Sequence, residues 1–320
     1  MPVFEMPLES MKTYPGSSPC PENIDVYWDR AIREMKAIDP EVQLLPAEFT
    51  CPYADCYHMY YTGVGGARIY AKLVKPKKRS EAGCPAVVLF HGYSMDSGDW
   101  HGMLPYAAAG FVAAAMDCRG QGGRSEDIGG VRGNTLHGHI IRGLEEGPEK
   151  LLFRSIYLDA AQLAGLVMAM PEVDENRVGA FGGSQGGGLT LACASLEPRI
   201  QRCAPQYPFL CDFKRIGNMD LNVDAYSEIK EWFRRFDPHH MRENEFYNTL
   251  SYIDLQNLAK RIKAQTLMIT ALMDTICPPS TQFAAYNKIG AEKNMLLYHD
   301  FGHEYLPGSS DRVFEFMMEL

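Results

Sequence analysis

The chain of 320 residues has room for about two average domains, although α/β folds of this length often form a single one. Hydrophobic residues make up 46% and charged residues 22% of it, as in ordinary soluble globular proteins, and the net charge of −9 argues against nucleic acid or an anionic membrane as the main partner. No apolar run reaches the length of a membrane span, and residues 1–6 lack the basic start and apolar core of a signal peptide.

The first 50 residues are expected to form an extension ahead of the main fold. Residues 1–20 are rich in proline and irregular. Residues 24–37 are predicted to form a helix because Trp28, Ile32 and Met35 recur at helical spacing.

A hairpin is predicted next, with strands at 56–62 and 68–74 around the glycine-rich turn 63–66. The basic segment 75–79 that follows is interpreted as a solvated turn.

From residue 86 onward, continuous apolar strands alternate with helices. This pattern predicts a mostly parallel central sheet covered by helices on both faces, with reactive groups at the carboxyl ends of the strands. The strands are expected at 86–90, 111–116, 178–181, 201–204, 266–272 and 295–299, and the helices at 105–109, 150–170, 189–196, 280–289 and 312–320.

One segment, about 209–262, interrupts this rhythm and is rich in charged and aromatic residues. We interpret it as an insertion that caps a site or forms a subunit contact, with a plain surface excursion as the alternative. The whole chain, 1–320, is therefore predicted to be a single domain with an N-terminal extension and a cap-like insertion.

The sequence Gly182-Gly-Ser-Gln-Gly186 lies between a predicted strand and a predicted helix. This G-x-S-x-G pattern in a strand–turn–helix context is typical of a nucleophile elbow, in which Ser184 stands above the sheet. The turn is so tight that a Cβ atom at the neighbouring positions is expected to collide with it.

A serine nucleophile needs a base, and the base needs an orienting carboxylate. In the order Ser, Asp, His, the residues that follow the later strands are Asp274 and His303. His299 competes as the base but lies at the strand end itself, and Asp300 is too close to the histidine along the chain to reach round it.

An oxyanion hole needs two backbone N–H groups. One is expected from Gln185, directly after the nucleophile, and the other from Tyr93, in the loop that starts His91-Gly92. A simple tight turn is the alternative interpretation of His91-Gly92.

Three motifs in this order, Arg119-Gly-Gln121, Gly182-Gly-Ser-Gln-Gly186 and His303-Glu304, resemble those of carbohydrate esterase family 7, the acetyl xylan esterases and cephalosporin C deacetylases of the α/β-hydrolase fold. The helix with Tyr27-Trp28 and the hairpin are similar too, so the resemblance covers essentially the whole chain.

The resemblance implies hydrolysis of acetyl esters on short xylo-oligosaccharides and on cephalosporin C. It implies a triad of Ser184, His303 and Asp274, an oxyanion hole at Tyr93 and Gln185, and no metal or organic cofactor. It also implies a homohexamer whose active sites face an inner cavity. The nine scattered cysteines predict reduced, mostly buried thiols and a cytoplasmic location.

Arg119 follows a strand beside the nucleophile strand. We predict that its guanidinium pairs with Glu304 and that the pair, with Gln121 of the same motif, braces the site without reacting. An ordinary surface arginine is the alternative.

Three other functions are weaker alternatives. A metal hydrolase would use His137, His139 and His101, but no further ligand falls at a usual spacing. A serine peptidase of this fold usually carries a large extra domain, and a non-catalytic member would lack a triad residue.

Overall fold

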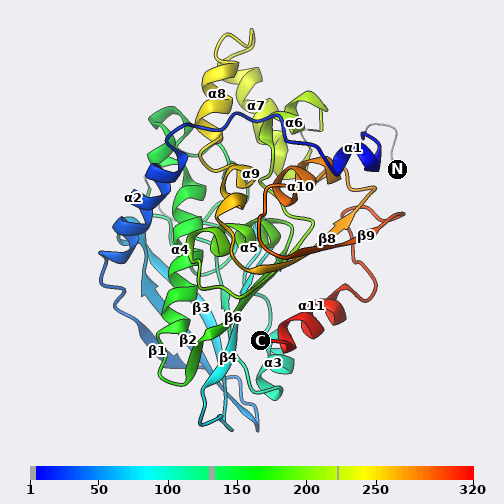
Figure 1. The fold of residues 1–320 in the computed structure, drawn as a ribbon. Helices are drawn as coiled ribbons and strands as arrows, with labels where there is room; N and C mark the ends of the chain where they lie inside the picture. Colours follow the sequence, from blue (N-terminus) through cyan, green and yellow to red (C-terminus); the bar gives the residue numbers. More distant parts are fainter. Residues whose placement is uncertain (1–4, 130–133, 222) are drawn as a thin grey trace.

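The central sheet organises the molecule. The computed structural model describes residues 5–129, 134–221 and 223–320. Within them nine strands form one sheet in the order β1-β2-β3-β5-β4-β6-β7-β8-β9 (Figure 1). The strands are β1 (Gln43–Pro46), β2 (Ala54–Thr62), β3 (Arg68–Pro76), β4 (Cys84–Phe90), β5 (Val112–Met116), β6 (Val173–Gly183), β7 (Arg202–Gln206), β8 (Gln265–Ala271) and β9 (Lys293–Tyr298).

The sheet changes character along its width. Strands β1, β2 and β3 pair antiparallel, as does β3 with β5, whereas β5, β4, β6, β7, β8 and β9 run parallel. Parallel strands place all their carboxyl ends at one edge of the sheet, so the loops that follow them can share one site.

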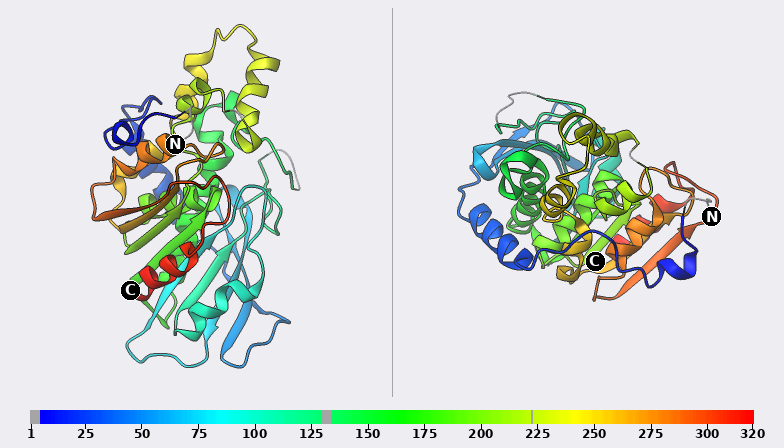
Figure 2. Two further views of the ribbon diagram at one scale, coloured as in Figure 1. Left: turned by 90° about the vertical axis from the view of Figure 1, so that its right-hand side faces the viewer. Right: turned by 90° about the horizontal axis from the view of Figure 1, so that it is seen from above.

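Helices cover both faces of this sheet (Figures 1 and 2). Two, α3 (Leu104–Ala108) and α11 (Ser309–Met318), lie on one face. The other face carries α2 (Ile24–Lys36), α4 (Leu152–Met168), α5 (Gln185–Leu196), α9 (Leu255–Leu258) and α10 (Pro279–Tyr286), and the short α1 (Leu8–Met11) packs on α10.

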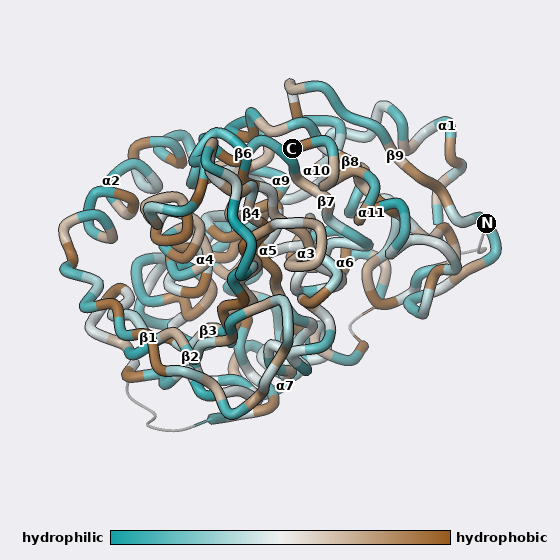
Figure 3. The backbone as a smooth tube through the Cα atoms, turned by 90° about the horizontal axis from the view of Figure 1, so that it is seen from below, coloured by the Kyte–Doolittle hydropathy of each residue, from teal (hydrophilic) through white to brown (hydrophobic). Residues whose placement is uncertain are grey.

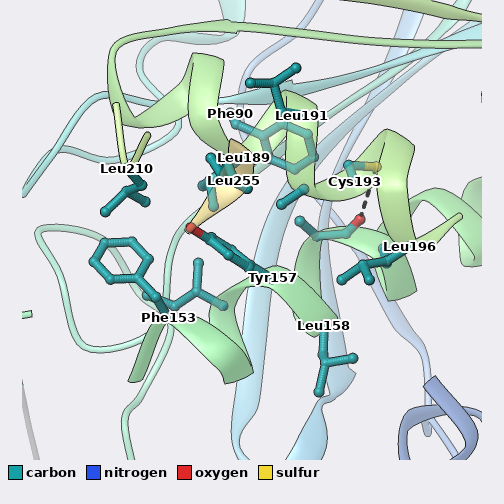
Figure 4. Packing of buried hydrophobic residues seen from close by; sticks show 14 of the residues in the cluster. Phe90, Phe153, Tyr157, Leu158, Leu189, Leu191, Cys193, Leu196, Leu210 and Leu255 are labelled. Atoms are coloured by element: carbon teal, nitrogen blue, oxygen red, sulfur yellow. Dashed lines mark hydrogen bonds between the residues drawn. The ribbon is translucent and has the colours of Figure 1, made fainter. Parts of the chain in front are cut away.

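Side-chain alternation along the strands divides the core between the two faces. In β4, Val87 packs towards α3 and α11, and the next residue, Val88, packs towards α4 and α5. Tyr157 of α4 and Leu189 of α5 are fully buried in the part of the core that lies on the face of the sheet covered by α4 and α5 (Figure 4). Burial of each such large side chain stabilises the fold by about 1.5–3 kcal/mol.

The predicted helix after residue 23 is confirmed as α2. Hydrophobic and hydrophilic residues alternate along it (Figure 3), and its apolar side packs on α4. Trp28 stacks on Tyr157 with ring centroids 5.9 Å apart, and its Nε1 donates to the Tyr252 carbonyl at 2.9 Å.

The insertion contains α6 (Phe213–Asn218), α7 (Ser227–Phe236) and α8 (Glu243–Leu250), which rise beyond the sheet (Figure 2). Helices α7 and α8 share an aromatic cluster in which the ring centroid of Phe246 lies 4.7 Å from those of both Trp232 and Phe233. The N-terminal extension is tied to the insertion because the Asp212 carboxylate accepts hydrogen bonds from Tyr14 and the Ser17 and Ser18 amides.

The predicted fold class, an α/β-hydrolase fold with a mostly parallel sheet, is confirmed. The bounds of several elements differ from the expected ones. Strand β6 begins at Val173 rather than at residue 178, β3 extends to Pro76 and so into the segment interpreted as a solvated turn, and the helix after Ser184 begins at Gln185 rather than at residue 189. The edge strand β1 was not among the predicted elements. Strand β1 has only four residues, three of them exposed, so it lacks the apolar alternation that marks a strand in sequence.

Candidate active site

Ser184 occupies the turn between β6 and α5. Its φ of 58° and ψ of −121° place a non-glycine residue in a strained region of backbone space. Three backbone bonds at 3.0 Å hold it there: its N–H donates to the Gln206 carbonyl, and its own carbonyl accepts from the amides of Gly188 and Phe209. Strain held in this way is common where a reacting group must be presented.

The glycines around Ser184 are required by close backbone contacts. A Cβ on Gly186 would lie 2.0 Å from the Phe90 carbonyl oxygen, and one on Gly182 would lie 2.6 Å from the same atom. Gly183 differs from the prediction, because its Cβ would meet only the Tyr207 ring at 3.4 Å, an ordinary contact. The predicted collision therefore holds at Gly182 and Gly186 and does not hold at Gly183.

Ser184, His303 and Asp274 lie in one hydrogen-bonded line. His303 Nε2 lies 3.0 Å from Ser184 Oγ, and His303 Nδ1 lies 2.8 Å from Asp274 Oδ2. The other oxygen of the fully buried Asp274 accepts from the amides of Ile276 and Cys277, both at 2.8 Å. This arrangement fixes the carboxylate and lets it orient the imidazole.

The competing residues lie elsewhere. His299 and Asp300 are exposed in the turn after β9, whereas His303 makes both contacts of the relay. Glu304, next to His303, is also exposed, and its Oε1 accepts from the Gly302 amide at 2.9 Å. The base predicted from the sequence is therefore the histidine that the structure brings to Ser184.

Gln185 directly follows Ser184 in the chain, and Tyr93 lines the same cavity as Ser184. The buried Gln185 side chain pairs with that of Gln121 at 2.9–3.0 Å. Gln121 Oε1 also accepts from the Ser94 amide at 3.0 Å, so this one side chain connects the nucleophile helix to the loop that contains Tyr93.

The imidazole of His91 supports the same loop from below. Its Nε2 accepts from the Cys118 amide at 2.9 Å, so Nδ1 carries the proton and donates to the Gly92 carbonyl at 2.7 Å. Burial lowers the pKa of His91, which keeps this neutral tautomer.

The predicted pairing of Arg119 with Glu304 is wrong. The guanidinium is buried and forms a two-pronged pair with Asp159 of α4, with Nε–Oδ2 at 2.7 Å and Nη2–Oδ1 at 2.6 Å. Its Nη1 donates to the Val64 carbonyl at 3.1 Å. Arg119 thus braces the hairpin and α4 instead of the loop that carries His303.

A cavity of about 450 Å³ opens over Ser184. Tyr93, Phe209 and Ile276 are among its walls, and Asp224 and Ala225 reach it from the insertion. Tyr207 was missed from the sequence; its ring centroid lies 4.5 Å from that of His303. The residues of the insertion carry no motif, so their place at the site could not be predicted from the sequence.

The histidines weighed as metal ligands have separate neighbours. His139 is buried with Nε2 against Thr135, and His137 lies 3.7 Å from Glu231. In the described part of the chain, a single group of three such residues, Asp274, Cys277 and His303, has ligand atoms within 4.8 Å of one another. In that group Asp274 bonds His303, and His303 bonds Ser184, an arrangement that suits proton transfer.

The sheet order, the elbow and a serine that contacts an Asp-oriented histidine define an α/β hydrolase. The acetyl xylan esterase (AXE1) family model matches residues 1–320, so the chain belongs to that family of carboxylic ester hydrolases. This confirms the family to which the three motifs pointed.

Solved structures of family members are similar over almost the whole chain. Acetyl xylan esterase 1 from Thermoanaerobacterium sp. JW/SL YS485 is 56% identical with a TM-score of 0.95, over 98% of this chain and 99% of that one. An acetyl xylan esterase from Paenibacillus sp. R4 is 37% identical with a TM-score of 0.92 over the same shares.

A curated relative, the acetyl esterase Axe7A of Xylanibacter ruminicola, is 26% identical over 283 residues, or 87% of this chain. The matched region spans 62% of the length of that relative.

Among the helices in the described ranges, none has both the length and the apolar character that a membrane span requires.

Proposed function

We propose that this protein is a serine esterase that removes acetyl groups from acetylated xylo-oligosaccharides and related small acetyl esters, including cephalosporin C. The observation that carries the proposal is the relay from Ser184 Oγ through His303 to Asp274, at an elbow of this family's fold. The relatives are named as acetyl xylan esterases and an acetyl esterase, and we therefore propose acetyl as the acyl group that is removed.

The reaction proceeds through an acetyl-enzyme. His303 Nε2 takes the proton of Ser184 as its oxygen attacks the acetyl carbonyl, and then gives that proton to the departing alcohol oxygen. Water then enters and loses a proton to the same nitrogen as it attacks the ester carbon. Acetate leaves, and the proton returns to Ser184 Oγ.

The negative oxygen of each tetrahedral intermediate is stabilised by the backbone N–H groups of Tyr93 and Gln185. Loss of one such donor costs about 10²–10³ in rate. Gln185 is the first residue of α5, so the helix dipole favours negative charge at the same position. The side chains of Gln121 and His91 support this assignment because they fix the two segments that supply the donors.

The walls of the cavity favour a short acyl group. Tyr93, Phe209 and Ile276 bring large side chains close to Ser184. The alcohol leaves through the open side of the cavity, where Asp224 is exposed. We therefore expect a narrow choice of acyl group and a broad choice of alcohol.

The site needs no cofactor for this chemistry, because the base, the nucleophile and the donors are protein groups. We further propose a homohexamer in a reducing cytoplasm. All nine cysteines are free and eight of them are buried, which supports the reducing compartment. Light scattering after gel filtration tests the hexamer.

Hydrolysis of p-nitrophenyl esters from acetyl to octanoyl, with the variant S184A in parallel, tests the proposal. A sharp preference for acetyl, lost by roughly 10⁶ in S184A as in a related triad, is expected. Release of acetate from acetylated xylo-oligosaccharides and from cephalosporin C then compares the alcohols. Activity that survives in S184A, or a preference for octanoyl, would contradict the mechanism.

A further inference from the structure

Glu228 is a fully buried carboxylate next to the candidate oxyanion loop. It lies on α7 of the insertion, 135 residues after Tyr93, and its Oε1 accepts from the Tyr93 hydroxyl at 2.6 Å. Its Oε2 accepts from the backbone amides of Ile140 and Ile141 at 2.8 and 3.0 Å. These bonds join three segments of the chain: α7, the loop that contains Tyr93, and residues 140–141. Hydrogen bonds to an ionised carboxylate are short and strong.

The phenol of Tyr93 is held from several directions. Its oxygen accepts from the His139 amide at 3.2 Å while it donates to Glu228. Its ring packs against His139 and Phe209, with centroids 4.8 and 5.7 Å apart. Tyr93, whose backbone N–H is the candidate oxyanion donor, therefore has its side chain fixed at the end far from the backbone.

We propose that Glu228 is a positioning residue for the esterase reaction: it holds the Tyr93 phenol from the insertion and so keeps the Tyr93 N–H aimed at the oxyanion. The inference rests on the proposed function, because it assigns a role within the same site. Gln121 and His91 fix the loop on the two sides of Tyr93, and Glu228 fixes Tyr93 itself.

This assignment gives the insertion a part in the chemistry beyond covering the cavity. A donor stabilises the transition state only if it points to where the charge develops, so small rotations reduce kcat more than substrate binding. Burial raises the pKa of Glu228, and its contact groups are a phenol and two amides, so the carboxylate depends on these bonds for its stability in the interior.

The test uses E228Q and Y93F. Y93F keeps the ring and the backbone N–H and removes only the hydroxyl that Glu228 accepts from. We expect each variant to lower kcat for p-nitrophenyl acetate by about 10- to 100-fold, with KM changed by less than about three-fold. The double variant is expected to be no worse than the poorer single variant, because both changes act on the same hydrogen bond: Y93F removes its donor, and E228Q replaces its carboxylate acceptor with an amide.

Trifluoroacetone provides a readout that a purely structural role would not move. It forms a hemiketal with the nucleophile and so carries the oxyanion. Its Ki is expected to rise in E228Q by the same factor as kcat/KM falls. The matched control is E231Q, which makes the same change on an exposed residue of the same helix and is expected to match the wild type.

The outcomes separate the two proposals. Activity that persists in S184A would overturn the proposed function and this inference with it. An inactive S184A beside Y93F and E228Q with unchanged kcat, or with additive losses in the double variant, would overturn the inference alone. Where E228Q melts too low to assay, Y93F and its trifluoroacetone Ki decide the question.

Discussion

The buried pair of Arg119 and Asp159 predicts a large loss of stability when only one partner is removed. The pair joins the loop after β5 to α4, with exposed fractions of 4% and 0% for the two side chains. In R119A the Asp159 carboxylate would remain buried without its cation. The bond from the Tyr61 hydroxyl to the Asp159 carbonyl, at 2.8 Å, would not replace it because it reaches only the backbone.

The expected cost is about 3–5 kcal/mol, the range for breaking a buried ion pair from one side. A chain of this size shifts its melting temperature by roughly 2 °C per kcal/mol, so R119A should melt about 6–10 °C lower at pH 8. The loss in kcat at 25 °C should stay well below the roughly 10²–10³ expected for loss of an oxyanion donor, since Arg119 contacts the hairpin and α4.

The stability lost in R119A is expected to depend on pH. Burial raises the pKa of Asp159, and Arg119 opposes this rise. Without Arg119 the native carboxyl holds its proton to higher pH than the unfolded chain does, so the penalty is full at pH 8 and shrinks as the pH falls and Asp159 is protonated. Melting curves of wild type and R119A from pH 8 to pH 5 should therefore converge.

A double substitution provides the control. R119M with D159L removes both charges and replaces them with apolar groups of similar size, so most of the lost stability should return. An R119A variant that melts within 1–2 °C of the wild type at pH 8, a shift of at most about 1 kcal/mol, would refute the reasoning, as would a gap that widens towards pH 5.

Three further predictions concern the site. G186A should be destabilised by more than about 4 kcal/mol, measured by melting or soluble yield, because its Cβ would lie 2.0 Å from the Phe90 carbonyl oxygen, whereas G183A should fold normally. D274N should keep the fold, measured by circular dichroism, and lose about 10⁴ in kcat, the loss known for another triad; a loss below ten-fold would contradict the relay. D224N should raise kcat/KM for cephalosporin C, which carries carboxylates, by up to about five-fold relative to a neutral xylo-oligosaccharide, and an equal change for both would exclude a charge effect.

Local sequence patterns explain why the hydrogen-bonded line of Ser184, His303 and Asp274 could be predicted. Apolar runs mark the parallel strands, and the reacting groups must follow those strands, so Asp274 and His303 were placed by position alone. The glycines around Ser184 marked the elbow, because close approach of the backbone to β4 excludes a side chain. These constraints are local in sequence, and few residue types satisfy each of them.

Partners of buried charges are not local, and here the sequence misled. Glu304 was chosen for Arg119 because it lies next to the base, but the partner is Asp159, 40 residues from Arg119. A signal was present: Arg154 and Asp159 are the only charged residues in the mostly apolar 17-residue run of α4. A carboxylate in such a helix needs a buried cation, and Arg119 was available.

Glu228 offered no such signal, because α7 carries charged residues along its whole length and a buried one cannot be distinguished from the rest. The two buried carboxylates also differ in what faces them. Asp159 faces a cation, so a change on one side leaves an unpaired charge and should cost stability more than rate. Glu228 faces a hydroxyl and two amides, so E228Q leaves no unpaired charge and should cost rate more than stability. R119A should therefore lower the melting temperature more than kcat, and E228Q should lower kcat more than the melting temperature. That contrast would distinguish a residue that stabilises the fold from one that positions the proposed donor.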